Sequence, residues 1–272
     1  MEATIEQSSP SRDQARKDER IMLGPGDKIG EGDCYVVLDF LPPDLADHAF
    51  ENLCNEVRWS TMYHRGGEVP RLVAVEGEVN NDGSFPIYRH PADESPALHP
   101  FSPTVARIRA HVAAALGAPV NHVLIQDYRS GADYISEHSD KTIDVVRGSH
   151  IVNVSLGAQR VMTLRTKKDA LTGDRERRAV QRVPLPHNSM FVMGLETNAR
   201  WMHGIRRDQR LPQYKSDAER AEDGERISLT LRTIGTFLTP GRNAFMDRAR
   251  GGRRARTRMR WCAVDRRRRN SS

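Results

Sequence analysis

The chain has 272 residues, of which 38% are hydrophobic and 29% charged, proportions typical of a soluble globular protein. No apolar stretch approaches the length of a transmembrane helix, and the polar N-terminus lacks the apolar segment of a signal peptide. We therefore expect an intracellular protein, in the nucleus or the cytoplasm, with no membrane partner. The three cysteines are far apart, which argues against a disulfide framework and a cysteine-rich zinc module.

The net charge of +6 is unevenly distributed along the chain. Residues 242–272 contain twelve arginines against two aspartates, a net charge of +10, which leaves −4 for the rest. Such an arginine run can bind nucleic acid, act as a nuclear import signal or form a solvated end. We expect 241–272 to be a disordered Arg-rich tail.

The N-terminal part of the chain predicts a strand and a helix. Residues 1–30 end in a turn-rich segment and are expected to be disordered. Cys34–Leu41 then indicates a short buried strand. A helix is expected from Pro43, because apolar residues follow at helical spacing, at Leu45, Ala49, Leu53 and Val57.

A second helix is expected between Pro103 and Gly117. Ser102 is its expected N-cap, proline suits its first position, and glycine ends it. Between the two helices, residues 59–99 are rich in Gly, Pro and Asn, which indicates loops and short strands.

From Val123 onward the sequence changes to short β-rich segments separated by turn residues. Seven of them occur in about 110 residues, a pattern that predicts a β-sandwich or jelly-roll barrel. The segments are VLIQDY, HIVNVSL, RVMTLRT, AVQRVPL, SMFVM, ARWMHGI and RISLTLRTI. A polar insertion between Arg206 and Glu225 is expected to be a surface loop.

Within this β region, His138 and Asp140 form a possible metal site. Ligands at positions i and i+2 of an extended chain point to the same side. His203, in a later strand, is the candidate third ligand. Two histidines and one carboxylate leave positions open on an octahedral metal, the arrangement used for oxygen activation by non-haem Fe(II). Taken alone, these three residues favour the commoner alternative, in which the histidines are hydrogen-bonded structural residues.

Two arginines in the last strong strand support the metal interpretation. Arg226 and Arg232 are six residues apart and therefore share a strand face. A buried arginine is costly unless a carboxylate faces it, and a dicarboxylate cosubstrate provides one. The alternative is a pair of edge-strand arginines that meet surface Asp or Glu residues.

The order of these features resembles the AlkB family of oxidative dealkylases. The similar segments follow one another as IQDYRSGADYISEHSD, IVNVSLGAQRVMTLR, HNSMFVMG, WMHGI and RISLTLR, between about Pro70 and Ile234. The resemblance implies a mainly β (α+β) fold, a double-stranded β-helix or jelly-roll core at 121–240. Two supporting helices would pack outside it, and 31–120 would supply this helical support and a substrate lid.

The resemblance also implies roles for individual residues. Fe(II) is expected as the metal, with 2-oxoglutarate and dioxygen as cosubstrates, and no catalytic residue beyond their ligands. The expected metal ligands are His138, Asp140 and His203, and the expected cosubstrate residues are Arg226, Tyr128, Gln126, Ser228 and Arg232. Gln126 and Ser228 replace asparagines of the family, but both side chains can still form hydrogen bonds. Thr142 replaces an acidic residue that contacts the base in repair-type members.

By the same resemblance, the expected function is Fe(II)- and 2-oxoglutarate-dependent hydroxylation or oxidative demethylation. An alkylated base of DNA or RNA is the family's default substrate, with Tyr88, Trp59 and His64 as candidate stacking groups beside Thr142. The main alternative is a tailoring oxygenase that acts on a small molecule of secondary metabolism. A non-catalytic binding module on the same fold is the third hypothesis. We expect a monomer.

Overall fold

The computed structural model describes residues 22–64, 67–89, 96–168, 178–239 and 242–247. Its largest sheet has eight strands in the order β1-β11-β8-β13-β6-β3-β2, with β5 paired to β3. The pairing is antiparallel throughout except between β3 and β5. The strands are β1 Tyr35–Val37, β2 Ser60–His64, β3 Gly67–Gly77, β5 Leu98–Pro100, β6 His122–Tyr128, β8 Ile151–Gly157, β11 Ser189–Met193 and β13 Arg226–Arg232.

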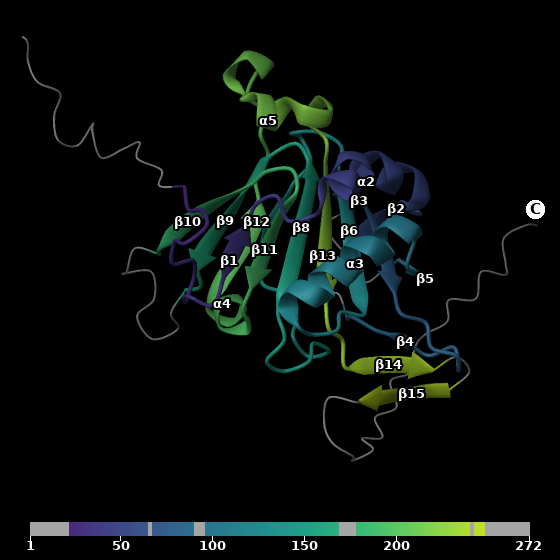
Figure 1. Ribbon diagram of the computed structural model, residues 1–272. Coiled ribbons are helices and arrows are strands. Elements are labelled where there is room, and N and C mark those ends of the chain that lie inside the picture. The colour runs from purple at the N-terminus through teal and green to yellow at the C-terminus, as the bar shows by residue number, and fades with distance from the viewer. Residues whose placement is uncertain (1–21, 65–66, 90–95, 169–177, 240–241, 248–272) are drawn as a thin grey trace, which may run out of the picture.

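A second sheet has four antiparallel strands in the order β10-β9-β12-β7. They are β7 Ile135–His138, β9 Arg160–Thr166, β10 Val180–Leu185 and β12 Trp201–Ile205. One core cluster combines residues of both sheets, among them Phe191 of the large sheet and Leu164 of the small one. The two sheets therefore enclose an apolar layer, which confirms the expected jelly-roll fold (Figure 1).

Two helices cover the outer face of the large sheet (Figure 1). They are α2 Pro43–Glu56 and α3 Pro103–Leu116, which begin with proline as expected. Apolar residues at helical spacing, such as Leu53 and Ile108, pack with strand residues in a second core cluster. Gly117 ends α3 in the left-handed conformation, at φ 61°, which is a favourable one for glycine.

The backbone N–H groups at the N-terminus of α3 are not capped by the Ser102 side chain, contrary to our expectation. The Ser102 side chain forms no capping bond, and its hydroxyl donates instead to Glu76 at 3.2 Å. The orphan N–H of Thr104 donates to Glu56, at the end of α2, at 2.8 Å. The helix is thus capped by a neighbouring element, so this contact depends on tertiary packing.

The middle of the lid region contains more strand than the sequence indicated. β3 is eleven residues long, because it pairs with β2 on one side and with β6 on the other. A third sheet joins this region to the C-terminal part of the chain. It contains β4 Phe85–Pro86, β14 Thr236–Thr239 and β15 Arg242–Asp247.

Two expected boundaries are corrected by the structure. Residues 242–247, which we expected in the disordered tail, form β15 and pair with β14. Near the N-terminus, the N–H of Leu23 donates to the carbonyl of Arg182 at 2.8 Å, so this part of 1–30 is bound to β10. Residues 1–21 and 248–272 lie outside the described residues. The other expected boundaries between the segments of the chain remain predictions.

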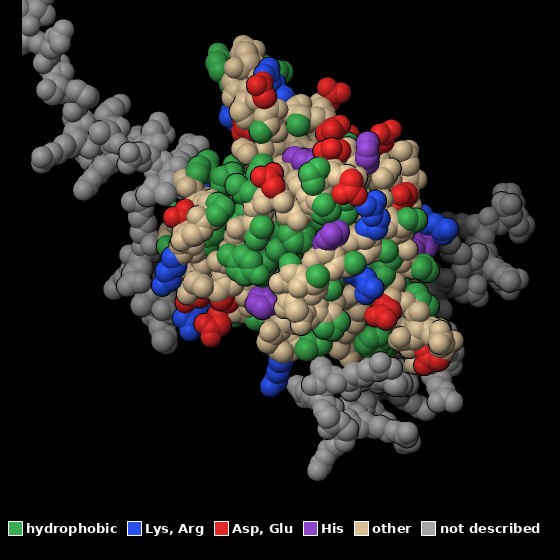
Figure 2. All heavy atoms as spheres, in the orientation of Figure 1, with side chains coloured by type: hydrophobic (Ala, Val, Ile, Leu, Met, Phe, Trp, Pro, Cys, Tyr) green, Lys and Arg blue, Asp and Glu red, His purple; other side chains and the backbone are tan. Residues whose placement is uncertain are grey.

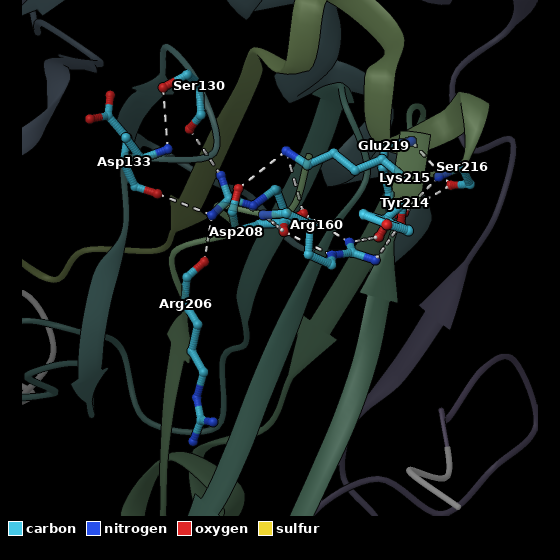
Figure 3. A network of polar contacts seen from close by, with 11 residues as sticks. Ser130, Asp133, Arg160, Arg206, Asp208, Tyr214, Lys215, Ser216 and Glu219 are labelled. Carbon is cyan, nitrogen blue, oxygen red and sulfur yellow. Dashed lines mark hydrogen bonds and ion pairs between the residues drawn. The ribbon is translucent and has the colours of Figure 1, made fainter. Parts of the chain in front are cut away.

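The polar insertion after β12 lies at the surface, but it is not a plain loop. It contains η2 Pro212–Tyr214, α5 Asp217–Arg220 and η3 Ala221–Gly224, and it projects from one end of the sheets (Figure 1). Ser216 and Glu219 form a capping box at α5. Arg210 donates to Asp208 and Glu219, which holds the two halves of the insertion together (Figure 3).

Arg160 of β9 connects this insertion to the loop after β6. Its guanidinium donates to the carbonyls of Ser130 at 3.2 Å, Asp133 at 3.0 Å and Arg206 at 2.5 Å (Figure 3). Arg160 therefore joins the loop that follows Tyr128 to the end of β12.

On the face drawn in Figure 2, acidic and basic side chains are interspersed over the described surface. Among the described residues, no helix has the length and apolarity to span a membrane.

Candidate active site

The pairing of β7 with β12 brings the first two candidate ligands together. His138 lies opposite His203 in the register of these strands, and their ring centroids are 4.4 Å apart. Asp140 follows two residues after His138. Its Oδ1 is 3.6 Å from the Nε2 atom of each histidine. The three ligand atoms lie within 4.8 Å of one another, as binding to one metal ion requires.

Neighbouring groups orient these side chains. His138 Nδ1 is 2.8 Å from the carbonyl oxygen of Ser136, which leaves Nε2 toward the site. The Asn198 amide accepts from the Asp140 N–H at 2.9 Å and donates to the Asp140 carbonyl at 3.0 Å. Asn198 belongs to α4 Leu195–Arg200, the helix that immediately precedes β12. The loop that carries the carboxylate is therefore held against the strand that carries His203.

The charge states of Asp140 and His203 suit a metal site. Burial alone would raise the pKa of Asp140, but Arg232 and the two histidines hold that pKa well below its usual range. Arg232 donates to Asp140 Oδ2 through Nε at 2.9 Å and Nη2 at 2.5 Å. Burial lowers the pKa of His203 to about 4, so its ring stays neutral near neutral pH. An ionised carboxylate and neutral imidazoles are the forms that bind metal.

Arg226 lies at the other end of the same cavity. Its side chain is 1% exposed, and Nη2 donates to Asn153 Oδ1 at 3.1 Å and Ser155 Oγ at 2.8 Å. Nε and Nη1 have no partner among the described residues. Burial lowers the pKa of Arg226 to about 10, so the guanidinium is still charged near neutral pH. Two free donors on a buried cation fit one carboxylate of a dicarboxylic acid.

The remaining cosubstrate candidates surround this arginine. In the register of β13 with β6, Arg226 lies opposite Tyr128 and Ser228 opposite Gln126. The hydrogen-bond network orients the Gln126 amide with its oxygen toward Arg71 Nε, 2.9 Å away, and its nitrogen toward the Tyr128 hydroxyl, 3.3 Å away. All of these side chains and the metal triad line one cavity of about 240 Å³. The residues that we expected to bind metal and cosubstrate are thus brought together, while their roles remain predictions.

Sequence reasoning missed four residues of this site. Asn153 and Ser155 bind Arg226, Arg71 binds Gln126, and Asn198 orients the Asp140 loop. The first two had a detectable signal. They alternate with apolar residues in the otherwise hydrophobic segment IVNVSL, so they share one strand face with period two. Arg71 and Asn198 had no comparable signal, because their contacts depend on how separate strands and helices pack.

The candidate substrate residues are only partly brought together. Tyr88 lines the cavity, its hydroxyl accepts from the Lys141 N–H at 3.1 Å, and Arg232 lies 4.3 Å from its ring centroid. Trp59 follows α2 and packs against the core cluster beneath the helices instead of lining the cavity. Thr142 is exposed and also outside the cavity lining. The side chain of His64 lies outside the described part of the structure.

Asp144, two residues after Thr142, has another partner. Arg89 donates to its carboxylate from the backbone N–H at 3.0 Å, from Nε at 3.0 Å and from Nη2 at 2.5 Å. Arg232 pairs with Asp140 itself.

Two facing antiparallel sheets that carry two histidines, one carboxylate and a buried arginine define a non-haem iron oxygenase site. Residues 33–232 match the family model described as the 2OG-Fe(II) oxygenase superfamily, and the chain belongs to this family. Its metal is accordingly Fe(II), with 2-oxoglutarate and dioxygen as cosubstrates. The unpartnered atoms of Arg226 and the triad geometry fit these groups.

Known relatives confirm the AlkB-like character. The chain is 33% identical over 167 residues to DNA oxidative demethylase ALKBH2 of Homo sapiens, across 59% of this chain and 62% of that protein. It is 29% identical over 195 residues to alpha-ketoglutarate-dependent dioxygenase alkB homolog 3 of Bos taurus, across 70% and 62%. The chain thus spans roughly three fifths of the length of these curated relatives. The solved structure of OsALKBH1 superposes with a TM-score of 0.48 at 16% identity, across 74% of this chain and 96% of that one.

Proposed function

We propose that this protein is an Fe(II)- and 2-oxoglutarate-dependent dioxygenase that removes a methyl group oxidatively from an alkylated nucleic-acid base. The observation that supports it most strongly is Arg226, a fully buried cation whose Nε and Nη1 have no partner among the described residues, in the same cavity as His138, Asp140 and His203. A zinc hydrolase or a structural histidine cluster would leave that arginine unexplained. The relatives named DNA oxidative demethylase support the nucleic-acid substrate.

Each group of residues has a separate task in this proposal. His138, Asp140 and His203 hold the metal, and Arg226 with Asn153 and Ser155 holds the far carboxylate of the cosubstrate. When bound, iron, 2-oxoglutarate and dioxygen together supply the oxidation of a C–H bond, which the protein could not perform with side chains alone. Oxidation of an N-methyl group gives a hydroxymethyl group that is released as formaldehyde.

The chain also orients the reacting groups. Arg232 binds the Asp140 oxygen that does not face the histidines, so it determines which carboxylate oxygen is available to the metal. Contacts with the Lys141 N–H and the Arg232 guanidinium hold Tyr88 in the cavity wall, where it forms the substrate side in this proposal. Apolar residues such as Met62, Leu124 and Phe191 line the walls and limit the access of water.

The test is conversion of 2-oxoglutarate to succinate by the purified chain with Fe(II), measured with and without a methylated single-stranded oligonucleotide. We expect turnover that the oligonucleotide stimulates with release of formaldehyde, and losses of more than about 100-fold in His138→Ala and Asp140→Ala. An Ile143→Ala variant, at a residue 71% exposed and outside the cavity lining, serves as the control. Absence of succinate from the wild-type protein under every condition would refute the dioxygenase proposal.

A small-molecule substrate is the second candidate. It is favoured by the position of the acidic side chains, because Thr142 offers none and Asp144 is occupied by Arg89. Turnover that small methylated metabolites stimulate, and methylated oligonucleotides do not, would select this alternative. The location in the nucleus or cytoplasm and the monomeric state stay predictions.

A further inference from the structure

The cavity carries an excess of positive charge. Among the residues that the structure describes, its lining includes four cationic side chains but one carboxylate, Asp140. The cations are Arg71, Lys141, Arg226 and Arg232. Bound Fe(II) and the 2-oxoglutarate dianion have equal and opposite formal charges, so they leave this excess unchanged. A substrate group that enters the cavity therefore meets three more positive charges than negative ones.

No carboxylate of the described lining remains for the substrate. One oxygen of Asp140 faces the two histidines, and the other accepts from Arg232. Two acidic residues that are close to Asp140 in sequence pair with arginines and lie outside the cavity lining. Asp144 is 2% exposed and pairs with Arg89, and Glu137 pairs with Arg165 at 2.9 Å and with Arg206 at 3.2 Å.

The substrate side of the cavity also offers hydrogen-bond donors. Lys141, an exposed residue whose side chain ends in an ammonium group, lines this side. Its backbone N–H already donates to the Tyr88 hydroxyl. Arg232, 2% exposed, stacks on the Tyr88 ring, and its Nη1 has no partner among the residues that the structure describes. Donors on cationic groups bind a carbonyl oxygen well and repel an amino group that carries positive charge.

We propose that the substrate is a neutral N-methylated base with a carbonyl oxygen beside the methylated nitrogen, as in 3-methyluracil, and not a cationic base such as 3-methylcytosine. This inference rests on the proposed function and specifies its substrate class. The two bases have nearly the same shape and differ at one exocyclic position, where one has an oxygen and the other an amino group. Charge and donor pattern, rather than the size of the cavity, must therefore distinguish them.

The test compares the binding of three single-stranded oligonucleotides that differ at one central base: 3-methyluracil, 3-methylcytosine or unmodified uracil. Fluorescence anisotropy is measured with the full chain, Fe(II) and 2-oxoglutarate at neutral pH without dioxygen, so that no turnover occurs. We expect the Kd for 3-methyluracil to be lower than that for 3-methylcytosine by about tenfold or more. Equal affinity for all three oligonucleotides, or tighter binding of 3-methylcytosine, would overturn the inference.

Two charge-reversal variants locate the origin of the selectivity. Lys141→Glu places a carboxylate in the lining and is expected to strengthen 3-methylcytosine binding. The ratio of the Kd for 3-methylcytosine to the Kd for 3-methyluracil should then fall severalfold. Arg147→Glu makes the same change of charge at an exposed residue outside the lining, and the ratio should stay at its wild-type value. Equal effects of both variants would contradict an origin in the cavity. Succinate formation without the base preference refutes this inference alone, whereas absence of succinate refutes the proposed function.

Discussion

Among the described residues, Arg226 has the largest fully buried side chain, and none of them offers it a carboxylate partner. Asn153 and Ser155 satisfy one of its nitrogens, while two others remain without partners. Leaving a buried cation incompletely paired costs free energy. We therefore expect this cation to destabilise the protein without cosubstrate and to become favourable when a dicarboxylate binds.

Replacement of Arg226 by methionine tests this view of the residue. Because the apolar side chain removes a buried, partly unpaired charge, we expect the free energy of unfolding without cosubstrate to rise by about 1–2 kcal/mol. Added 2-oxoglutarate with Mn(II) should raise the Tm of the wild-type protein but not that of the variant. The measurement is thermal unfolding with and without the cosubstrate.

Arg89→Met serves as the comparison for this variant. It removes an arginine whose partner Asp144 is buried, so we expect lower stability but an unchanged response to 2-oxoglutarate. A cosubstrate-dependent rise in Tm that persists in Arg226→Met would contradict the assignment of Arg226.

At the scale of elements, the antiparallel pair β6 and β13 organises the site. Its register places Tyr128 opposite Arg226 and Gln126 opposite Ser228, so four cosubstrate candidates come from two strands. Asp127, between Gln126 and Tyr128, points to the other face of the strand. Burial, followed by the charge of Glu225, raises the pKa of Asp127 to about 7.

This raised pKa predicts a dependence of stability on pH. A carboxyl group whose pKa is higher in the folded state stabilises the fold when the pH is below the pKa of the unfolded state. It loses that contribution as the pH rises through the pKa of the folded state. The free energy of unfolding should therefore fall between about pH 4 and pH 7, by roughly 1–2 kcal/mol after allowance for solvent screening. Asp127→Asn cannot ionise and should flatten this part of the curve.

Urea denaturation at several pH values between 4 and 8 measures this effect. Asp47→Asn, at an exposed aspartate of α2, is the control and should follow the wild-type curve. The prediction fails when the wild-type and Asp127→Asn curves remain parallel across this range.

At the scale of the whole molecule, a slightly acidic body is joined to a strongly basic end. Residues 248–272 contain eleven of the chain's arginines and lie outside the described residues. β15 ends at Asp247, so removal of the residues after it leaves the third sheet intact. An electrostatic contribution of this segment to nucleic-acid binding can thus be separated from that of the cavity.

Truncation after Asp247 should weaken the binding of single-stranded DNA at low salt and reduce its dependence on salt. Each arginine that neutralises a phosphate adds about 0.7 to the slope of log K against log salt for single strands. We expect the slope to fall by about 2 or more, measured by anisotropy titrations over a range of salt concentrations. A full-length variant with Arg266–Arg269 replaced by glutamine controls for chain length. An unchanged slope after truncation would exclude the tail as a nucleic-acid arm.

The sequence by itself determined the parts of this protein that depend on local chemistry. Helical spacing and prolines predicted α2 and α3, the alternation of short β segments predicted the jelly roll, and the HxD pattern with a later histidine predicted the three ligands. Arg226 was recognisable because a charged residue in a strongly apolar strand requires a partner. The helix and strand signals follow a simple period, whereas the ligands were recognised from the order of several motifs along the chain.

Tertiary structure decided what depends on pairing between distant segments. The contact of Arg232 with Asp140 joins residues 92 positions apart, and that of Arg89 with Asp144 joins residues 55 apart. Spacing in the sequence cannot show which acidic group each arginine meets, because strand register and loop packing determine those distances. The charge balance of the cavity follows from these pairings. The iron site was therefore predictable from the sequence, whereas the cavity charge that we propose selects the substrate became evident only in the folded chain.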